Sequence, residues 1–262
     1  MGLLLLLFAL LFQVSVARSR FDTTGCVVDL VFVLDGSGSI TSQDWQSCLK
    51  FVSVATNVLN VSDVGSHVGI VQFATRTRVE SLLTGNNATL SALIPKIRQL
   101  TGDTNMGAGL TVAWQDVFAK SSRVGPPKII VLVTDGKPNI GYDPVDLATQ
   151  LKGPKFNVSI VCVGVGDDVD LPTLQKIASP PISNTVFSVS AWDQLLSYVR
   201  KLVASTCNVA CPNGCSGHGT CNRDGTCACS VGWSGADCSQ GCPDNCSGHG
   251  TCQNGVCQCQ AG

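Results

Sequence analysis

The chain has 262 residues and a formal net charge of −1, and charged residues make up only 13% of it. This composition provides no basic field, which excludes nucleic acids and anionic lipid surfaces as principal partners. The length suits one full α/β domain with small modules attached. The 15 cysteines indicate an oxidising compartment, and 11 of them follow Asn208, so the main domain boundary is expected near that residue.

Residues 1–17 have the pattern of a signal peptide. An apolar run over residues 2–12 is followed by Ser15 and Ala17, small residues that suit a cleavage site, so we expect Arg18 to begin the mature chain. The run is too short for a stable membrane anchor, and no later stretch reaches transmembrane length. We therefore expect a secreted or extracellular protein with no membrane insertion in this sequence.

Apolar runs and amphipathic segments alternate along the main domain. They predict, in chain order, strand 27–34, helix 41–59, strand 67–74, strand 77–83, helix 89–100, helix 107–121, strand 128–134, helix 143–151, strand 156–164, helix 170–179, strand 185–189 and helix 191–204. Such alternation is typical of a doubly wound, mostly parallel sheet with helices on both faces. Strands 67–74 and 77–83 are too close in sequence for a crossover, so they form a hairpin that makes one edge strand antiparallel. The predicted fold class is α/β with a six-stranded sheet.

The first predicted strand ends in the sequence DGSGS. Asp35 follows a run of apolar residues, and Ser37 and Ser39 stand at alternate positions after it. One carboxylate and two hydroxyls are hard oxygen donors of the kind that Mg²⁺ and Mn²⁺ prefer. The alternative is that Asp35 caps a helix and both serines are ordinary loop residues.

Two further segments favour the metal interpretation. The apolar run at residues 128–134 ends just before Asp135, and a glycine-rich turn places Thr104 before an amphipathic segment. In open α/β sheets, ligands bind at the carboxyl ends of the strands, so these residues are expected at one edge of the sheet.

Residues 26–207 resemble a von Willebrand factor type A domain. The resemblance rests on DGSGS from Asp35, on Thr104 in GDTNMG, on VTDG around Asp135, and on VCVGVGDD at residues 161–168. It implies the strand order 3-2-1-4-5-6 and a metal-ion-dependent adhesion site. In that site the metal ligands would be the hydroxyls of Ser37, Ser39 and Thr104. Asp35 and Asp135 would hold ligating waters and orient the hydroxyls.

The resemblance also implies a cofactor and a partner. The cofactor would be Mg²⁺ or Mn²⁺, with an open coordination position for a Glu or Asp supplied by an extracellular protein. One departure is Asp103, where many relatives have glycine. A carboxylate at that position either tightens metal binding or repels an acidic ligand. The segment at residues 166–171 lacks the extra helix of collagen-binding integrin inserts, so collagen recognition by that route is not predicted.

The C-terminal segment is a repeat of cysteine-rich modules. The heptapeptide CSGHGTC occurs at residues 215–221 and again at residues 246–252. The spacing resembles EGF-like domains of the tenascin and teneurin kind and predicts one module over 208–239 and an incomplete one over 240–262. Spacing alone leaves fifteen connectivities open for six cysteines. The resemblance implies the pairs Cys211–Cys221, Cys215–Cys227, Cys229–Cys238, Cys242–Cys252 and Cys246–Cys257.

Four other cysteines need separate treatment. Cys26 and Cys207 flank the main domain, whose ends lie near each other in this fold, so we expect them to be bridged. Cys48 and Cys162 are predicted to be buried thiols, with a bridge between them as the alternative. We expect Cys259 to have no partner within its module, because the given sequence holds no sixth cysteine for that module.

Sequons at Asn60, Asn87 and Asn157 are candidate glycosylation sites, whereas Asn245 is crowded by neighbouring cysteines. The repeated His218 and His249 suggest zinc, but disulfide use of the nearby cysteines would remove the ligands.

The sequence contains no Walker loop, no H-E-x-x-H pair and no nucleophile elbow, so we do not expect an enzyme. The domain order is similar to that of matrilin-like extracellular proteins. It implies an adhesion or matrix protein that binds an acidic group of a protein partner through a divalent metal. The alternatives are a structural or oligomerising scaffold with a non-functional metal site, and the truncated ectodomain of a membrane receptor.

Overall fold

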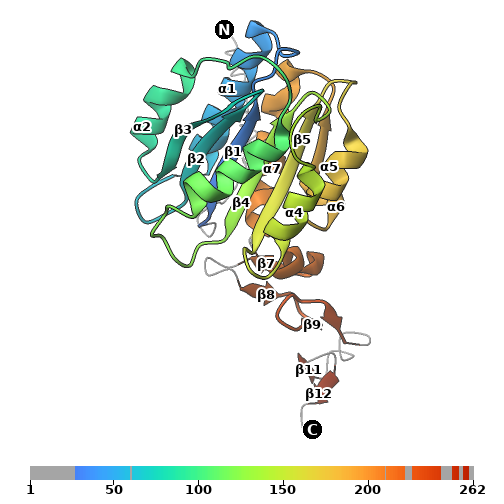
Figure 1. The fold of residues 1–262 in the computed structure, drawn as a ribbon. Helices are drawn as coiled ribbons and strands as arrows, with labels where there is room; N and C mark the ends of the chain where they lie inside the picture. The colour runs from blue at the N-terminus through green and yellow to red at the C-terminus, as the bar shows by residue number, and fades with distance from the viewer. Residues whose placement is uncertain are drawn as a thin grey trace, which may run out of the picture.

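The computed structural model describes residues 27–59, 61–209, 211–221, 226–242, 250–253 and 256–259. Its centre is a six-stranded sheet with the strand order β3-β2-β1-β4-β5-β6 (Figure 1). The strands are β1 (Asp29–Asp35), β2 (His67–Phe73), β3 (Thr77–Thr84), β4 (Lys128–Thr134), β5 (Val158–Val165) and β6 (Val186–Val189). Only β3 runs antiparallel to its neighbour, so the predicted fold class and hairpin edge are confirmed.

Helices cover both faces of this sheet. The first face packs against α1 (Ser42–Val58), α2 (Asn87–Leu93) with η1 (Ile94–Lys96), and η3 (Trp192–Gln194) with α7 (Leu195–Val209). The second face packs against α3 (Met106–Val112), η2 (Ala113–Phe118), α4 (Pro144–Lys152), α5 (Leu171–Ile177) and α6 (Ile182–Thr185). Each face therefore has its own apolar core.

The central strand β1 contributes to both cores because successive side chains alternate between the faces. Leu30, Phe32 and Leu34 belong to the first core, whereas Val31 and Val33 belong to the second. All of them are almost fully buried, which explains why the strand reads as a continuous apolar run.

Cys48 and Cys162 are both fully buried free thiols. Cys48 lies in the first core, on α1, and Cys162 lies in the second core, on β5. The sheet separates them, so the alternative of a bridge between these two cysteines is wrong. Burial raises the pKa of each thiol far above its ordinary value.

The segment predicted as helix 89–100 is shorter in the structure. Asn86 accepts a hydrogen bond from the Thr89 backbone N–H (3.0 Å) and caps α2, which ends at Leu93. Pro95 follows in η1, where its ring and missing N–H prevent continuation of the α-helix. The rest of the segment is a loop that crosses toward the carboxyl end of β1, which matters for the site described below.

The helix predicted over residues 107–121 also differs in the structure. It consists of α3 followed by one stretch of π-helix, η2. An α-to-π change alters the helical repeat, so a pattern based on 3.6 residues per turn does not detect it.

The C-terminal module follows α7 and lies at one end of the main domain (Figure 1). It contains η4 (Pro212–Gly217) and short strands β7 (Gly219–Cys221), β8 (Cys227–Cys229), β9 (Trp233–Ser234) and β10 (Gln240–Gly241). After the antiparallel pairs β7–β8 and β9–β10, a third antiparallel pair, β11 (Gly250–Gln253) and β12 (Val256–Cys259), belongs to the next module. Such small modules depend on cross-links because they bury few aliphatic side chains.

Two disulfides of the C-terminal module are defined, Cys215–Cys227 and Cys229–Cys238, and both are pairs that the EGF resemblance implied. Because Cys215 and Cys227 are cross-linked, their sulfurs are not available as thiolate ligands for zinc. His218 stacks on Trp233 instead, with ring centroids 3.3 Å apart.

Four further cysteines, Cys207, Cys211, Cys242 and Cys257, are also disulfide-bonded. Their pairings stay predictions, because Cys26 and Cys246 and the side chains of Cys221 and Cys252 lie outside the described residues. Five further predictions also fall outside the described residues; they concern the side chain of Cys259, the signal peptide, Asn60, Asn245 and His249.

Among the described residues, no helix combines the length and the apolar character needed to cross a membrane.

Candidate functional site

Asp35 is the last residue of β1, which lies between β2 and β4. The order in which strands are added to the sheet reverses here, so this is its topological switch point. Its side chain is fully buried and both carboxylate oxygens accept hydrogen bonds. The backbone N–H of Ser37 donates to Oδ1 (2.9 Å), and the hydroxyl of Thr134 donates to Oδ2 (2.6 Å). The carboxylate therefore holds the turn after β1 and connects it to the end of β4.

Both serines of the motif belong to one chain of hydrogen bonds. The hydroxyls of Ser37 and Ser39 lie 3.1 Å apart, and the Ser39 hydroxyl donates to Oδ1 of Asp135 (2.9 Å). Ser37 is buried and Ser39 is exposed, so the chain of oxygens leads from the interior to the surface. The structure thus brings Asp35, Ser37, Ser39 and Asp135 together, although Asp135 lies 96 residues after Ser39.

Thr104 reaches the same place from the loop before α3. Its backbone N–H donates to the Asn139 side chain (2.8 Å), and its carbonyl accepts from the Asn139 N–H (3.2 Å). A Cβ atom added at Gly136 would lie 4.0 Å from the Thr104 hydroxyl oxygen. The hydroxyl therefore lies beside the loop that carries Asp135.

Residues that the sequence interpretation missed brace these loops. Gln72 is buried in β2, and its Oε1 accepts from the Leu100 N–H (2.6 Å). A Cβ atom at Gly36 would come within 2.2 Å of that same oxygen, so a side chain at position 36 would displace Gln72 from this contact. Gln99 donates to the carbonyls of Ser37 and Ile40, at 2.9 Å each. A glutamine inside an otherwise apolar strand was the signal that could have revealed Gln72.

Among the residues that the structure describes, no basic side chain forms an ion pair with either carboxylate of the site. Burial raises the pKa of Asp35 to about 6, against opposing hydrogen bonds from Ser37 and Thr134, and the nearby charge of Asp135 adds to the rise. Burial also raises the pKa of Asp135, against the hydrogen bond from Ser39, and the charges of Asp44 and Asp168 add to that rise. A cation would relieve this repulsion and desolvation.

The donor set fits a hard divalent cation. The two serine hydroxyls and two carboxylates converge, and the Thr104 hydroxyl lies beside Gly136. All these donors are oxygen atoms, and the carboxylates lack a positive neighbour among the groups that shift their pKa. Asp103, the departure from the family pattern, is exposed and accepts a hydrogen bond from Thr75 (3.2 Å). That bond holds its carboxylate at the rim of the site.

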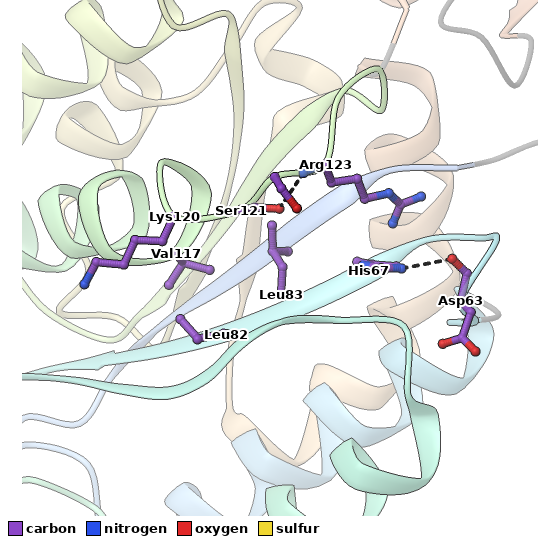
Figure 2. A pocket seen from close by; sticks show the side chains of 9 residues that line it. Asp63, His67, Leu82, Leu83, Val117, Lys120, Ser121 and Arg123 are labelled. Carbon is purple, nitrogen blue, oxygen red and sulfur yellow. Dashed lines mark hydrogen bonds between the residues drawn. The ribbon is translucent and has the colours of Figure 1, made fainter.

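Apart from the candidate metal site, a hollow lies at the opposite end of the sheet, near the start of β2 (Figure 2). His67 contacts the carbonyl oxygen of Asp63 (3.2 Å), and Arg123 forms an ion pair with the buried Asp29 (3.1 Å). Both polar groups are thus engaged in contacts that hold loops together. His67 belongs to this edge and takes no part in the candidate metal site.

A doubly wound sheet with hydroxyls and carboxylates at its switch point defines a class of metal-dependent binding domain. Residues 29–201 match the von Willebrand factor type A domain, and residues 211–241 match the teneurin-like EGF domain. Because the first match covers more than half of the sequence, the chain belongs to the von Willebrand factor type A family. This membership agrees with the prediction that the protein is not an enzyme.

Two curated proteins are similar to this chain over the type A domain. Matrilin-3 of Gallus gallus is 28% identical over 192 residues, which is 69% of this chain and 41% of the relative. Vitrin of Homo sapiens is 29% identical over 184 residues, which is 68% of this chain and 26% of the relative. The chain thus spans less than half of the length of either protein.

A solved structure is also similar. It is proximal thread matrix protein 1 from the mussel byssus, whose metal-ion-dependent adhesion site (MIDAS) motif is occupied by zinc. The two chains are 28% identical, with a TM-score of 0.63. The likeness covers 70% of this chain and 46% of that one.

Proposed function

We propose that this protein is a secreted adhesion or matrix protein whose type A domain binds an acidic group of a protein partner through a divalent metal. The observation that carries the proposal is the hydrogen-bonded chain Ser37–Ser39–Asp135, which the buried Asp35 anchors at the switch point of the sheet. The zinc-occupied motif of the mussel relative supports it.

Each residue of the proposed site has a distinct task. The hydroxyls of Ser37, Ser39 and Thr104 would hold the ion, because neutral oxygen ligands leave its charge available to a further ligand. Asp35 accepts from the Ser37 backbone N–H and Asp135 from the Ser39 hydroxyl, so the two carboxylates hold the serine turn and would supply the negative charge that the ion requires. When bound, the ion would supply an electrophilic position for a carboxylate of the partner.

We propose Mg²⁺ or Mn²⁺ as the physiological ion. Every donor in the site is an oxygen atom, and carboxylate and hydroxyl sets suit Mg²⁺ and Mn²⁺ better than soft metals. Zinc in the relative is compatible with the same geometry, since Zn²⁺ also takes oxygen ligands. A titration of the full chain with Mg²⁺, Mn²⁺ and Zn²⁺ by calorimetry compares the three ions directly.

An extracellular location is part of the proposal. The disulfides of the EGF module form and persist in oxidising compartments. Asn157 is exposed just before β5 and is open to a glycan, whereas Asn87 is half-buried and its side-chain nitrogen donates to Asn57 (3.2 Å). Asn157 is therefore the better placed of these two sequons.

The competing candidate is a structural matrix component whose metal site only stabilises the fold. The similarity to the mussel relative, a thread matrix protein, favours it. The deciding experiment is a pull-down from an extracellular matrix extract with the immobilised full chain, in Mg²⁺ and in EDTA. Adhesion through the metal requires partners that EDTA releases and that Asp35→Ala fails to capture. Partners retained equally in EDTA would favour the structural role.

A further inference from the structure

The segment between η1 and Thr104, residues 97–103, contains neither helix nor strand. Each of its residues nevertheless forms a hydrogen bond with a residue outside the segment. At its start, the indole N–H of Trp45 donates to the Ile97 carbonyl (3.0 Å), and at its end the Asp103 N–H donates to the Thr75 hydroxyl (2.8 Å). Segment 97–103 is therefore held along its whole length by α1, β2 and the candidate metal site.

The middle of segment 97–103 lies against the turn that carries the candidate serine ligands. The Thr101 N–H donates to the Gly36 carbonyl and the Gly38 N–H donates to the Gly102 carbonyl, at 2.8 Å each. Thr101 has a φ of 64°, a left-handed conformation that is costly for a β-branched residue. Such a conformation persists only where the surrounding contacts hold it, so the segment and the serine turn form one unit.

Gln99 provides the side-chain link between the segment and this turn. Its Nε2 donates to the carbonyls of Ser37 and Ile40, at 2.9 Å each, and these two residues are the ends of the turn that contains Ser39. Without the amide, the direct bond that remains between the ends of the turn is the long one from the Ile40 N–H to the Ser37 carbonyl (3.3 Å). Gln99 therefore fixes how far apart the hydroxyls of Ser37 and Ser39 lie.

The spacing of two hydroxyl ligands affects different ions differently. Mg²⁺ requires near-ideal octahedral geometry with bonds of about 2.0–2.1 Å, so adjacent oxygen ligands lie about 3 Å apart. The 3.1 Å between the hydroxyls of Ser37 and Ser39 suits that ion. Ca²⁺ takes about six to eight ligands at about 2.3–2.6 Å in a flexible arrangement. A looser serine turn should therefore weaken Mg²⁺ binding more than Ca²⁺ binding.

We propose that Gln99 is a positioning residue that holds Ser37 and Ser39 at the spacing for Mg²⁺ and thereby sets the preference of the site for Mg²⁺ over Ca²⁺. The inference rests on the proposed function, since it concerns the ion of that site. Gln99 acts through the serine turn, because its amide donates to backbone carbonyls. A neutral amide does not attract cations as the carboxylates of Asp35 and Asp135 do, so its effect is one of geometry.

The first test loads the full chain with Mn²⁺, displaces it with Mg²⁺ or Ca²⁺, and follows the released Mn²⁺ by electron paramagnetic resonance. Gln99→Met keeps the length of the side chain and removes both donated bonds. It should weaken Mg²⁺ binding about tenfold, the low end for groups that orient metal ligands, and Ca²⁺ binding by less than about threefold. Asp35→Ala gives the background of ions bound elsewhere. Gln115→Met, at an exposed glutamine on η2, is the matched control and should keep both affinities.

The variant Gln99→Lys separates positioning from a general structural role. Its ammonium group has three donors on a flexible four-carbon stem that reaches the same carbonyls, and its charge opposes both divalent ions alike. It should lower both affinities and restore the wild-type ratio of Mg²⁺ to Ca²⁺ affinity. In EDTA, hydrogen exchange at the N–H groups of Gly38 and Thr101 should be about tenfold faster in Gln99→Met, with no change along β1.

The outcomes separate this inference from the proposed function. If Gln99→Met keeps the wild-type ratio of the two affinities, whether both are retained or both fall equally, the positioning role is overturned and the metal site stands. A wild-type chain without a preference for Mg²⁺ gives the same result, as does a lowered ratio that Gln99→Lys fails to restore. If the wild type binds no more Mn²⁺ than Asp35→Ala does, the proposed function fails and this inference fails with it.

Discussion

The hydroxyl of Thr134 donates a 2.6 Å hydrogen bond to the carboxylate of Asp35, although 99 positions separate the two residues. Thr134 is the last residue of β4 and Asp35 is the last residue of β1, and both are fully buried. The bond joins the ends of the two central strands below the chain of hydroxyls. It leaves the second oxygen of Asp35 to hold the Ser37 turn, so the exposed part of the site rests on a buried and fully satisfied carboxylate.

Asp35→Ala should weaken binding of Mg²⁺ and Mn²⁺ by at least 10- to 100-fold, the size typical of groups that orient metal ligands. The fold should persist, as shown by an unchanged circular dichroism spectrum. Thr104→Ala should have a smaller effect, since it removes one neutral oxygen. Calorimetric titration measures the Mg²⁺ and Mn²⁺ affinities of the wild type and of both variants. Asp63→Ala is the control for the loss of one negative charge. Wild-type affinity in Asp35→Ala would disprove the assignment of the site.

Stability without metal should depend on pH through Asp35. Its pKa is about 6 in the folded chain and about 3.9 when unfolded. The folded state therefore binds more protons between these values. The free energy of unfolding in EDTA should fall as pH rises from about 4 to about 6, by roughly 3 kcal/mol at most.

Urea unfolding at several pH values in that range tests this dependence. Asp35→Asn should flatten it and should be more stable than the wild type at pH 7 without metal. A variant with the same slope as the wild type would show that other groups cause the pH dependence.

Arg123→Met should destabilise the domain by about 3–5 kcal/mol at pH 7.5, because it leaves a buried carboxylate unpaired. Asp29 is only 1% exposed, and Arg123, labelled in Figure 2, is its ion-pair partner. Burial already raises the pKa of Asp29 against the attraction of Arg123, so the loss should be smaller at pH 5, where the carboxyl takes up a proton more readily.

Chemical denaturation measures the cost of Arg123→Met, and the double variant Asp29→Asn/Arg123→Met should recover part of it. Metal affinity should not change, since the pair lies at the opposite edge of the sheet. A single variant as stable as the wild type would contradict the structural role of the pair.

Cys48 and Cys162 should resist alkylation in the folded protein. Both side chains are fully buried, and burial holds the pKa of each thiol far above its ordinary value, so thiolate is scarce. Iodoacetamide labelling followed by mass spectrometry should find neither residue modified before unfolding and both modified in guanidinium. Rapid labelling of either one in native buffer would argue against its place in the core.

A glycan should be attached more fully at Asn157 than at Asn87. The Asn157 side chain is exposed, whereas the nitrogen of Asn87 that would carry the sugar is engaged with Asn57. Glycopeptide mass spectrometry of the secreted chain gives both occupancies. Higher occupancy at Asn87 would show that attachment precedes formation of the Asn57 contact.

The sequence alone determined the local features of this protein. The doubly buried run of β1, the short connection between β2 and β3, and the acid-and-hydroxyl pattern after Asp35 are properties of neighbouring residues, and they predicted the fold class. The family resemblance added the strand order. Pro95 lies inside the segment predicted as helix 89–100 and prevents the α-helix from continuing, so the helix is shorter than its amphipathic pattern indicates.

Only the tertiary structure decided which distant groups meet. The Thr134–Asp35 bond, the close fit of Gln72 against Gly36, and the separation of Cys48 from Cys162 by the sheet all depend on how strands pair and on which face each side chain takes. A one-residue change in register would place each strand side chain on the other face. Local sequence patterns constrain that register weakly, whereas the packing of two cores against one sheet specifies it.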